Sequence, residues 1–566
     1  MRILLSSVFG PYGVDDAYGR KENIMELFHN QVTREQDLFS LRFHHQSFGL
    51  YFIAENIQAP TTVLDFPSQD AFIREIKKGY DTIGISFIVP NFAKAKRMAG
   101  LIREHAPQSK IILGGHGTQV PGIEELIEHD YICRGEGVAW FRKFLGEDPG
   151  QPLSHPILPS GFSKRIVGVP QKTSAAVLIP GVGCPNACRF CATSHFFGKK
   201  YTAFFETGQE LFDICQKLEK ELGSKEFFVM DENFLKRPER ARELLGLMEK
   251  NNKYYRFGIF SSAEAVAQVG VEFLTRLGVY FLWIGVESKY EIYEKNRSID
   301  LPTMIRQLKD HGISVLASAI LFLEQHDKQT IWDDIQFVVD LGSDMVQFMQ
   351  LGPLPGTRLY ENYDRQGILK KDIPFEEWHG QHRLWFEHPN FSPGESEDLL
   401  RKAFRYDYNQ QGATILRMCE TVIRGIRKLA DYNDKHMRER RQFLVKKAAS
   451  LRPILEVLKK YAHNRHVRSL TQKVIDSYSA EFGPPTFKQK ILSKVALAYA
   501  AFEAVRVTTK NNVYQPRTFR TNYRIPAKIL IAEQLQQRIV SFAEFQAELQ
   551  NQLEPLAQSV PAEQQK

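Results

Sequence analysis

Three cysteines stand close together in the stretch Val182-Gly183-Cys184-Pro185-Asn186-Ala187-Cys188-Arg189-Phe190-Cys191, with the spacing Cys-x3-Cys-x2-Cys. The stretch closely follows the apolar run Ala175–Pro180. Thiolates are preferred ligands of iron–sulfur clusters. Three thiolates hold only three irons of a four-iron cluster, so the fourth iron stays open for a ligand that is not protein. A chelating amino acid, with its amine and carboxylate, suits that open position.

With Phe190 beside the last cysteine, the motif resembles that of the radical S-adenosylmethionine (SAM) superfamily. The resemblance implies a [4Fe-4S] cluster held by Cys184, Cys188 and Cys191. It also implies that SAM binds the open iron and is cleaved to a 5′-deoxyadenosyl radical. Three other interpretations stay open, namely a zinc site with His195 as fourth ligand, a disulfide pair, and buried cysteine thiols.

Length and composition indicate a folded protein of several domains. A chain of 566 residues with 43% apolar residues suggests about three or four domains. No apolar run approaches the roughly 18 residues of a membrane span, and Met1–Phe9 is typical of a strand rather than a signal peptide. Six cysteines give no disulfide framework, which indicates a reducing cytoplasm. The net charge of +8 permits an acidic partner without requiring one.

Residues 1–150 alternate between apolar runs and amphipathic stretches. We expect strands at Arg2–Ser7, Thr61–Asp65, Thr82–Phe87, Lys110–Gly114 and Tyr131–Cys133, and helices at Asp70–Lys78, Phe92–His105 and Gly122–Glu128. This alternation predicts an α/β domain with an open, doubly wound parallel sheet, Rossmann-like and of the flavodoxin type.

Ligands of such sheets bind at the carboxyl ends of the strands. The residues there are Ser86, then Gly114, Gly115 and His116, then Gly135, Glu136 and Gly137. Their order resembles the cobalamin-binding domain fused to many radical SAM enzymes, which implies that they contact cobalamin. The other interpretations are a generic nucleotide-binding sheet and a sheet without a ligand.

One departure from the cobalamin pattern concerns the lower face of the cobalt. The Asp-x-His-x-x-Gly motif that supplies a histidine ligand in base-off domains does not occur here. We therefore expect no protein histidine on the cobalt, and we expect Phe87–Asn91 to face its lower side.

After a Pro-, Gly- and Ser-rich link at 151–172, residues 173–390 repeat a strand-then-helix unit six times. We expect strands at Ala175–Pro180, Glu226–Met230, Tyr255–Phe260, Tyr280–Val286, Val315–Leu323 and Met345–Leu351, and helices at Gly208–Leu222, Arg237–Lys250, Glu264–Leu277, Pro302–His311 and Thr330–Leu341. Six units match the partial (β/α)6 barrel of the radical SAM family, in which the chemistry sits at the carboxyl ends of the strands.

The resemblance also assigns SAM contacts at those ends. Asp231 and Glu232 follow the second strand, where a carboxylate suits the SAM ammonium. Ser261, Ser262 and Glu287 end the next strands, near the expected ribose and methionine carboxylate, and Phe190 would lie near the adenine. The run Pro353–Tyr360 matches the Pro-x-Pro-Gly-Thr turn of cobalamin-dependent members. We expect no specific contact from Leu323–His326.

Residues 391–566 are predicted to form a helical C-terminal region rich in basic residues, such as Arg438-Glu439-Arg440-Arg441 and Lys446-Lys447. A solvated helix face is the simplest interpretation of these charges. An anionic substrate, carrier or membrane surface is the alternative.

The resemblance implies a cobalamin-dependent radical SAM enzyme that methylates an unactivated carbon. The alternatives are a rearrangement or cyclisation with the same cofactors, a tRNA methylthio-transferase, and a non-catalytic cobalamin sensor. The methylthio-transferases carry a second cysteine triad, whereas only Cys133 precedes Cys184 here. We expect a small-molecule, lipid or peptide substrate and an electron donor such as flavodoxin or ferredoxin. We expect no nucleic-acid partner.

Overall fold

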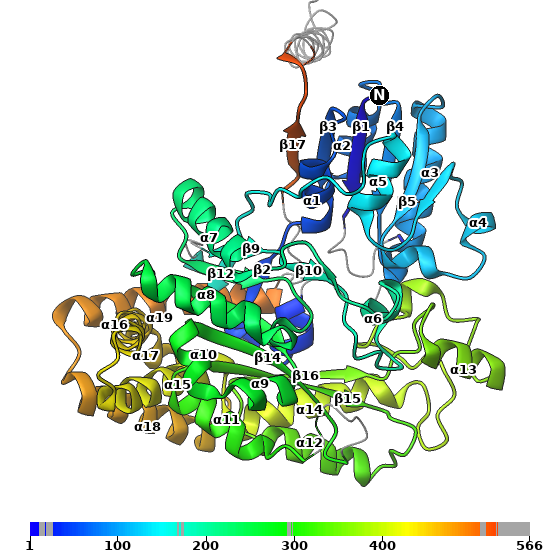
Figure 1. Ribbon diagram of the computed structural model, residues 1–566. Helices are drawn as coiled ribbons and strands as arrows, with labels where there is room; N and C mark the ends of the chain where they lie inside the picture. The colour runs from blue at the N-terminus through cyan, green and yellow to red at the C-terminus, as the bar shows by residue number, and fades with distance from the viewer. Residues whose placement is uncertain are drawn as a thin grey trace, which may run out of the picture.

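Two six-stranded sheets dominate the fold of this computed structural model (Figure 1). The structure describes residues 1–10, 17–18, 27–166, 169–170, 175–290, 296, 298–509, 517–527 and 529. The first sheet stands above the second in Figure 1, and most of the C-terminal helices lie beside and below the second.

The first sheet is doubly wound, as predicted. Its strand order is β17-β3-β1-β4-β5-β6, with five parallel strands and an antiparallel edge strand. The strands are β1 (Ile3–Ser7), β3 (Thr61–Asp65), β4 (Thr82–Ser86), β5 (Lys110–Gly114), β6 (Tyr131–Cys133) and β17 (Phe519–Tyr523). Apolar side chains of α1 (Phe48–Asn56) and α5 (Gly137–Leu145) pack on one face, and those of α2 (Gln69–Ile76) and α3 (Phe92–His105) pack on the other. The short helix α4 (Ile123–Leu126) precedes β6.

The second sheet is the predicted partial barrel of six parallel strands. Its order is β16-β15-β14-β13-β12-β9. The strands are β9 (Ala175–Leu178), β12 (Glu226–Val229), β13 (Arg256–Ser261), β14 (Val279–Glu287), β15 (Ser314–Leu321) and β16 (Met345–Gln350), and the helices are α7 (Gly208–Leu222), α8 (Pro238–Lys250), α9 (Ala263–Val269), α10 (Val271–Leu277), α11 (Leu301–Asp310), α12 (Thr330–Asp340) and α13 (Arg358–Gln366). The expected single helix Glu264–Leu277 is divided into α9 and α10 at Gly270.

Two segments differ from their expected place. The link is partly regular, because β7 (Phe162–Ile166) pairs with β2 (Arg42–His44) on one side and with β8 (Val169–Pro170) on the other in a small sheet. In addition, the segment 27–45 leaves the first sheet and enters the barrel. There Phe28, a residue of the short helix Phe28–Val32, contacts the rings of Phe281 and Trp283 on the inner face of β14.

Where the structure describes it, the C-terminal region is helical except for one strand. Its helices are α14 (Glu395–Gln411), α15 (Thr414–Lys428), α16 (Lys435–Leu451), α17 (Leu455–Lys460), α18 (Arg465–Phe482) and α19 (Phe487–Thr509). The exception is β17, which returns to the first sheet and pairs with β3. Within the described ranges, every helix is too short or too polar to cross a bilayer.

Candidate functional site

The three motif cysteines lie on one hydrogen-bonded loop between β10 (Gly181–Val182), which pairs with β11 (Thr202–Ala203), and α6 (Ala192–Phe196). The N–H of Cys191 donates to the carbonyl of Cys188 at 3.0 Å. Ser194 donates its hydroxyl to the carbonyl of Cys184 at 2.6 Å and its N–H to the sulfur of Cys191 at 3.5 Å. All six cysteines are within the described residues, and none forms a disulfide bond. The disulfide interpretation is therefore wrong, and three thiols remain as candidate ligands on a single loop.

His195 is fully engaged by the backbone. Its Nδ1 lies 2.9 Å from the carbonyl of Cys191, and its Nε2 accepts the N–H of Arg358 at 3.3 Å. Because Nδ1 must donate to that carbonyl, the proton sits on Nδ1. Neither nitrogen is left for a zinc ion. Among the described residues no three His, Cys, Asp or Glu side chains converge on one metal position. A four-iron cluster instead takes one thiolate per iron.

An ion pair holds the cysteine loop to the barrel. Arg189, which follows Cys188, donates to both carboxylate oxygens of Glu324 at 2.8 and 2.5 Å. The backbone carbonyl of Arg189 also accepts the N–H of Leu359 at the start of α13. The end of the fifth strand therefore does make a specific contact, with the cysteine loop. No sequence motif predicted the pairing of Arg189 with Glu324.

Glu232 is the carboxylate placed to meet a cationic group. It follows β12, and the backbone N–H of Gly183 in the cysteine loop donates to it. The side chain stays accessible to solvent. The protein packed around the carboxyl group displaces enough water to raise its pKa to about 7, and the charge of Asp231 adds to that rise. Glu232 thus links the cysteine loop to the second strand end.

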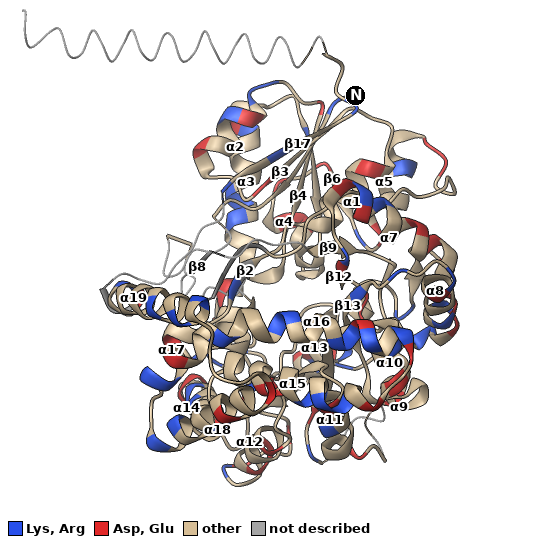
Figure 2. Cartoon of the chain, turned by 90° about the vertical axis from the view of Figure 1, so that its left-hand side faces the viewer, with Lys and Arg blue, Asp and Glu red and all other residues tan. Residues whose placement is uncertain are grey.

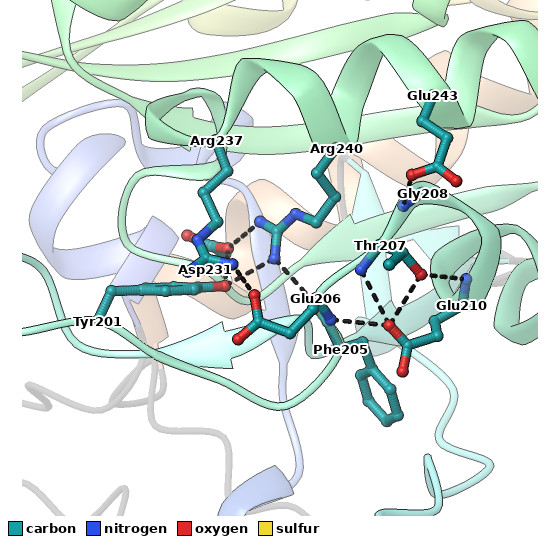
Figure 3. Close-up of polar contacts among 10 residues, drawn as sticks. All are labelled: Tyr201, Phe205, Glu206, Thr207, Gly208, Glu210, Asp231, Arg237, Arg240 and Glu243. Atoms are coloured by element: carbon teal, nitrogen blue, oxygen red, sulfur yellow. Dashed lines mark hydrogen bonds and ion pairs between the residues drawn. The ribbon is translucent and has the colours of Figure 1, made fainter.

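Asp231 has a different role from the one expected. Figure 3 shows Arg240 of α8 and Tyr201 reaching its carboxylate. Oδ2 accepts from Arg240 at 2.8 Å and from Tyr201 at 2.7 Å, and Oδ1 accepts the N–H of Asn233 at 3.0 Å. The Asp231 and Arg240 side chains are 0% and 2% exposed. These partners occupy both oxygens, so Asp231 positions the strand end.

Asn233 joins two strand ends at this edge of the barrel, a role that the sequence analysis missed. Its Oδ1 accepts from the hydroxyl of Ser261 at 2.9 Å, and its Nδ2 donates to the hydroxyl of Ser262 at 3.1 Å. Glu287, at the end of β14, is buried and has a φ of 64°, a conformation that is uncommon outside glycine. Phe190 is half-buried against the main core. All the expected SAM contacts therefore lie on the cysteine loop or at carboxyl ends of neighbouring strands.

The first sheet carries a cavity of about 320 Å³ at the carboxyl ends of its strands. All seven residues predicted to contact cobalamin line it, namely Ser86, Gly114, Gly115, His116, Gly135, Glu136 and Gly137. The remaining lining is largely apolar and includes residues of α1 and α5, such as Phe52 and Phe141. A largely apolar cavity with a few convergent polar groups is typical of a small-molecule site.

Phe87 explains two details at the edge of this cavity. Gly115 has a φ of +86°, and a Cβ there would lie 2.6 Å from the carbonyl oxygen of Phe87. Glycine is therefore needed here because the backbones of residues 115 and 87 pass close to each other. The ring of Phe87 packs in the core on the α2 and α3 side of the sheet. The expectation that Phe87 faces a ligand is therefore wrong.

His116 presents an unsatisfied nitrogen in the wall of this cavity. Its Nε2 is buried without a hydrogen-bond partner, and burial lowers the pKa of the ring to about 4. The neutral ring stacks on Phe196 of α6, with ring centres 4.5 Å apart. A buried nitrogen of this kind suits a ligand that brings a hydrogen-bonding group.

The cavity and the cysteine loop share a wall. Residues on both sides of the loop line the cavity, namely Ile179, Val182, Phe196, Phe197 and Phe204. In Figure 1, α6 lies between the first sheet and α13. The Pro-x-Pro-Gly-Thr turn also lies against the first domain. A Cβ on Gly356 would be 2.6 Å from Oε1 of Gln119, which follows β5. The two candidate cofactor sites are therefore neighbours.

Comparison with known proteins identifies the barrel. Residues 178–338 match the family model of the radical SAM superfamily. The chain contains a radical SAM domain. This confirms the prediction made from the cysteine motif and the six strand–helix units. The matched range begins in β9 and ends in α12, so it contains the cysteine loop and the first five strand ends.

Curated relatives of this chain are named as methyltransferases. An uncharacterized methyltransferase of Pyrococcus horikoshii is 22% identical over 364 residues, which are 55% of this chain and 77% of the relative. The bacteriochlorophyllide d C-12(1)-methyltransferase of Chlorobaculum tepidum is 26% identical over 323 residues, 53% of this chain and 69% of the relative. Among solved structures, the radical SAM methyltransferase TsrM of Kitasatospora setae, with cobalamin and a [4Fe-4S] cluster bound, is 13% identical with a TM-score of 0.48, and covers 79% of this chain and 99% of that one.

Proposed function

We propose that this radical SAM enzyme is a cobalamin-dependent methyltransferase that acts on an unactivated carbon. The observation that carries the proposal is the shared wall between the cavity of the first sheet and the cysteine loop. A methyl donor and a radical generator must act on the same substrate carbon, so their sites must adjoin. The names of the curated relatives support methyl transfer as the reaction.

The residues present fit both cofactors. Cys184, Cys188 and Cys191 supply thiols, and the hydrogen bond from Ser194 to the sulfur of Cys191 is of the kind that tunes a cluster's potential. The unpartnered Nε2 of His116 suits a carboxamide of the corrin periphery, which offers both a donor and an acceptor. When bound, the cluster with SAM supplies a carbon-centred radical, and cobalamin supplies the methyl group.

The protein's own groups hold and orient the reactants. Glu232 accepts the SAM ammonium, and the N–H of Gly183 keeps its carboxylate directed at the loop. Asn233 fixes Ser261 and Ser262 relative to the second strand. Phe196 and Phe197 give the cavity an aromatic wall next to the cysteine loop. The substrate belongs to the small-molecule, lipid or peptide class.

The products formed from labelled SAM test this proposal. Anaerobically reconstituted protein, supplied with reductant, cobalamin and cell extract as the substrate source, should form S-adenosylhomocysteine and 5′-deoxyadenosine together. Deoxyadenosine alone would indicate rearrangement or cyclisation instead. The absence of both products would contradict the proposal. The Cys188→Ala variant should form no deoxyadenosine.

A further inference from the structure

A second cavity, of about 200 Å³, lies at the end of the barrel opposite the cysteine loop. Its walls come from the starts of β13 and β14, from α10 and from α16. Tyr254 and Arg256 stand at the start of β13, whereas Ser261 ends the same strand on the cofactor side. The cavity is therefore separate from the cofactor sites.

The lining of this cavity is strongly cationic. Four of its residues are cations, namely Arg256, Arg276, Arg440 and Lys446, and only Glu439 carries a carboxylate. Two of the cations have partners outside the cavity, because Arg256 pairs with Glu226 at 3.1 Å and Arg276 pairs with Glu249 at 2.5 Å. No carboxylate of the described residues pairs with Arg440 or Lys446. Figure 2 shows the Lys and Arg positions along α16, which supplies both.

Arg440 is a buried cation with unused donors. The residue is 4% exposed. Its Nη2 donates to the carbonyl of Gly312 at 2.8 Å, but Nε and Nη1 are buried without an acceptor. Burial, together with the nearby Arg256, lowers the pKa of Arg440 to about 9, so the guanidinium stays charged at neutral pH. A buried, unpaired charge destabilises a protein unless a counter-ion satisfies it.

The guanidinium faces are already covered. Both Arg256 and Arg440 lie over the ring of Phe443, with distances of 4.4 and 5.5 Å to its centre. Stacking leaves the N–H edges of a guanidinium as its free donors. The buried hydroxyl of Tyr254, also without a partner, lies in the same wall. The site therefore offers several donors without matching acceptors.

We propose that this cavity binds the phosphate group of a small anionic molecule. The forked donors of arginine match phosphate oxygens in pairs, and two arginines beside a tyrosine hydroxyl suit a tetrahedral oxyanion. Because α16 from the C-terminal region closes the cavity over the barrel, a bound phosphate tightens that contact.

Calorimetric titration of the full chain with inorganic phosphate tests the proposal, in chloride buffer at constant ionic strength. Wild-type protein should bind one phosphate. Arg440→Met should weaken binding at least tenfold, and Tyr254→Phe by a few fold. Arg438→Met removes an exposed cation of the same helix that does not line the cavity, and it should bind as wild type does.

Thermal unfolding separates a lost site from a lost fold. Without phosphate, Arg440→Met should be at least as stable as wild type, because it removes an unpaired buried charge. Phosphate should raise the Tm of wild type and leave that of Arg440→Met unchanged. Equal phosphate affinity in wild type and Arg440→Met, no phosphate binding by wild type, or equally tight binding of citrate would each overturn the proposal.

Discussion

At the scale of single residues, neighbouring carboxylates have separate roles because their surroundings differ. Asp231 is buried with Arg240, while Glu232 stays accessible and has a pKa raised to about 7. A cation that arrives beside Glu232 meets a carboxyl group that is about half ionised at neutral pH. Burial, which the sequence does not display, distinguishes the two carboxylates.

Glu232→Gln should weaken SAM binding by about tenfold or more, because a charged hydrogen bond is worth roughly 1.5–3 kcal/mol. SAM affinity of the wild type should rise between about pH 6 and pH 8, since Glu232 is protonated below its pKa of about 7 and ionised above it. Equilibrium dialysis of the reconstituted protein measures both effects. Glu239→Gln, which alters an exposed carboxylate of α8, is the control. An identical pH dependence in Glu232→Gln would contradict this role.

Gly114→Phe should abolish cobalamin retention and leave the iron content unchanged. Gly114 lines the first cavity, and a Cβ there meets only ordinary contacts at 3.9 Å, so a large side chain enters the cavity rather than the backbone. Gly100→Phe adds the same ring at an exposed position of α3 and should retain cobalamin. The corrinoid absorption spectrum gives the measurement. Unchanged retention in Gly114→Phe would show that the cavity is not the cobalamin site.

At the scale of secondary-structure elements, contacts between distant segments hold the cysteine loop. The loop is fixed by Glu324 after β15 and by Leu359 at the start of α13. The helix α8 holds the end of β12 through the buried pair of Arg240 and Asp231. The barrel thus sets the geometry of the loop from several sides.

Glu324→Gln should slow SAM cleavage with little loss of stability. The side chains of Arg189 and Glu324 are 34% and 38% exposed, and ion pairs of this kind contribute about 1 kcal/mol or less. Rates of deoxyadenosine formation and the Tm of the same samples provide the test. A large fall in Tm with an unchanged rate would mean that the pair stabilises the fold without orienting the loop.

Arg240→Met should strongly destabilise the barrel, because it leaves Asp231 as an unpaired buried charge. Removal of one partner of such a pair costs about 3–5 kcal/mol. The double variant Arg240→Met with Asp231→Leu should recover much of the loss. Chemical denaturation followed by far-UV circular dichroism measures the difference, and equal stability of the single and double variants would contradict it.

The elements were largely predictable from sequence, whereas the contacts between them were not. Local alternation placed all six barrel strands within about two residues, and the turn residues placed Ser86 and Gly135 at strand ends. The pairing of β17 with β3, and of β2 with β7, depends on partners more than a hundred residues apart. Sequence periodicity reports only local neighbours. For the same reason the ion pair of Arg189 and Glu324, 135 residues apart, could not be predicted from the sequence.

At the scale of the whole molecule, the two sheets are interlocked rather than joined by one linker. The segment 27–45 runs from the first sheet into the barrel, where Phe28 meets Phe281 and Trp283. The strand β17 returns from the C-terminal region to the edge of the first sheet. These crossings hold the two cofactor sites in one fixed relation.

Removal of residues 1–150 should therefore leave a barrel that fails to fold, because its inner face loses the apolar cover of Phe28, Val32 and Leu41. Limited proteolysis of this shortened chain, compared with the full chain, measures the loss. A shortened chain that resists protease as well as the full chain would contradict the interlocking.

The adjacency of the two cofactor sites is tested most directly by electron paramagnetic resonance of the fully loaded protein. The reduced cluster and cob(II)alamin are both paramagnetic, so neighbouring sites predict that the cob(II)alamin signal is broadened when the cluster is reduced. The Cys188→Ala variant, without the cluster, should show the unbroadened signal. An unbroadened cob(II)alamin signal in the loaded wild-type protein would contradict the account.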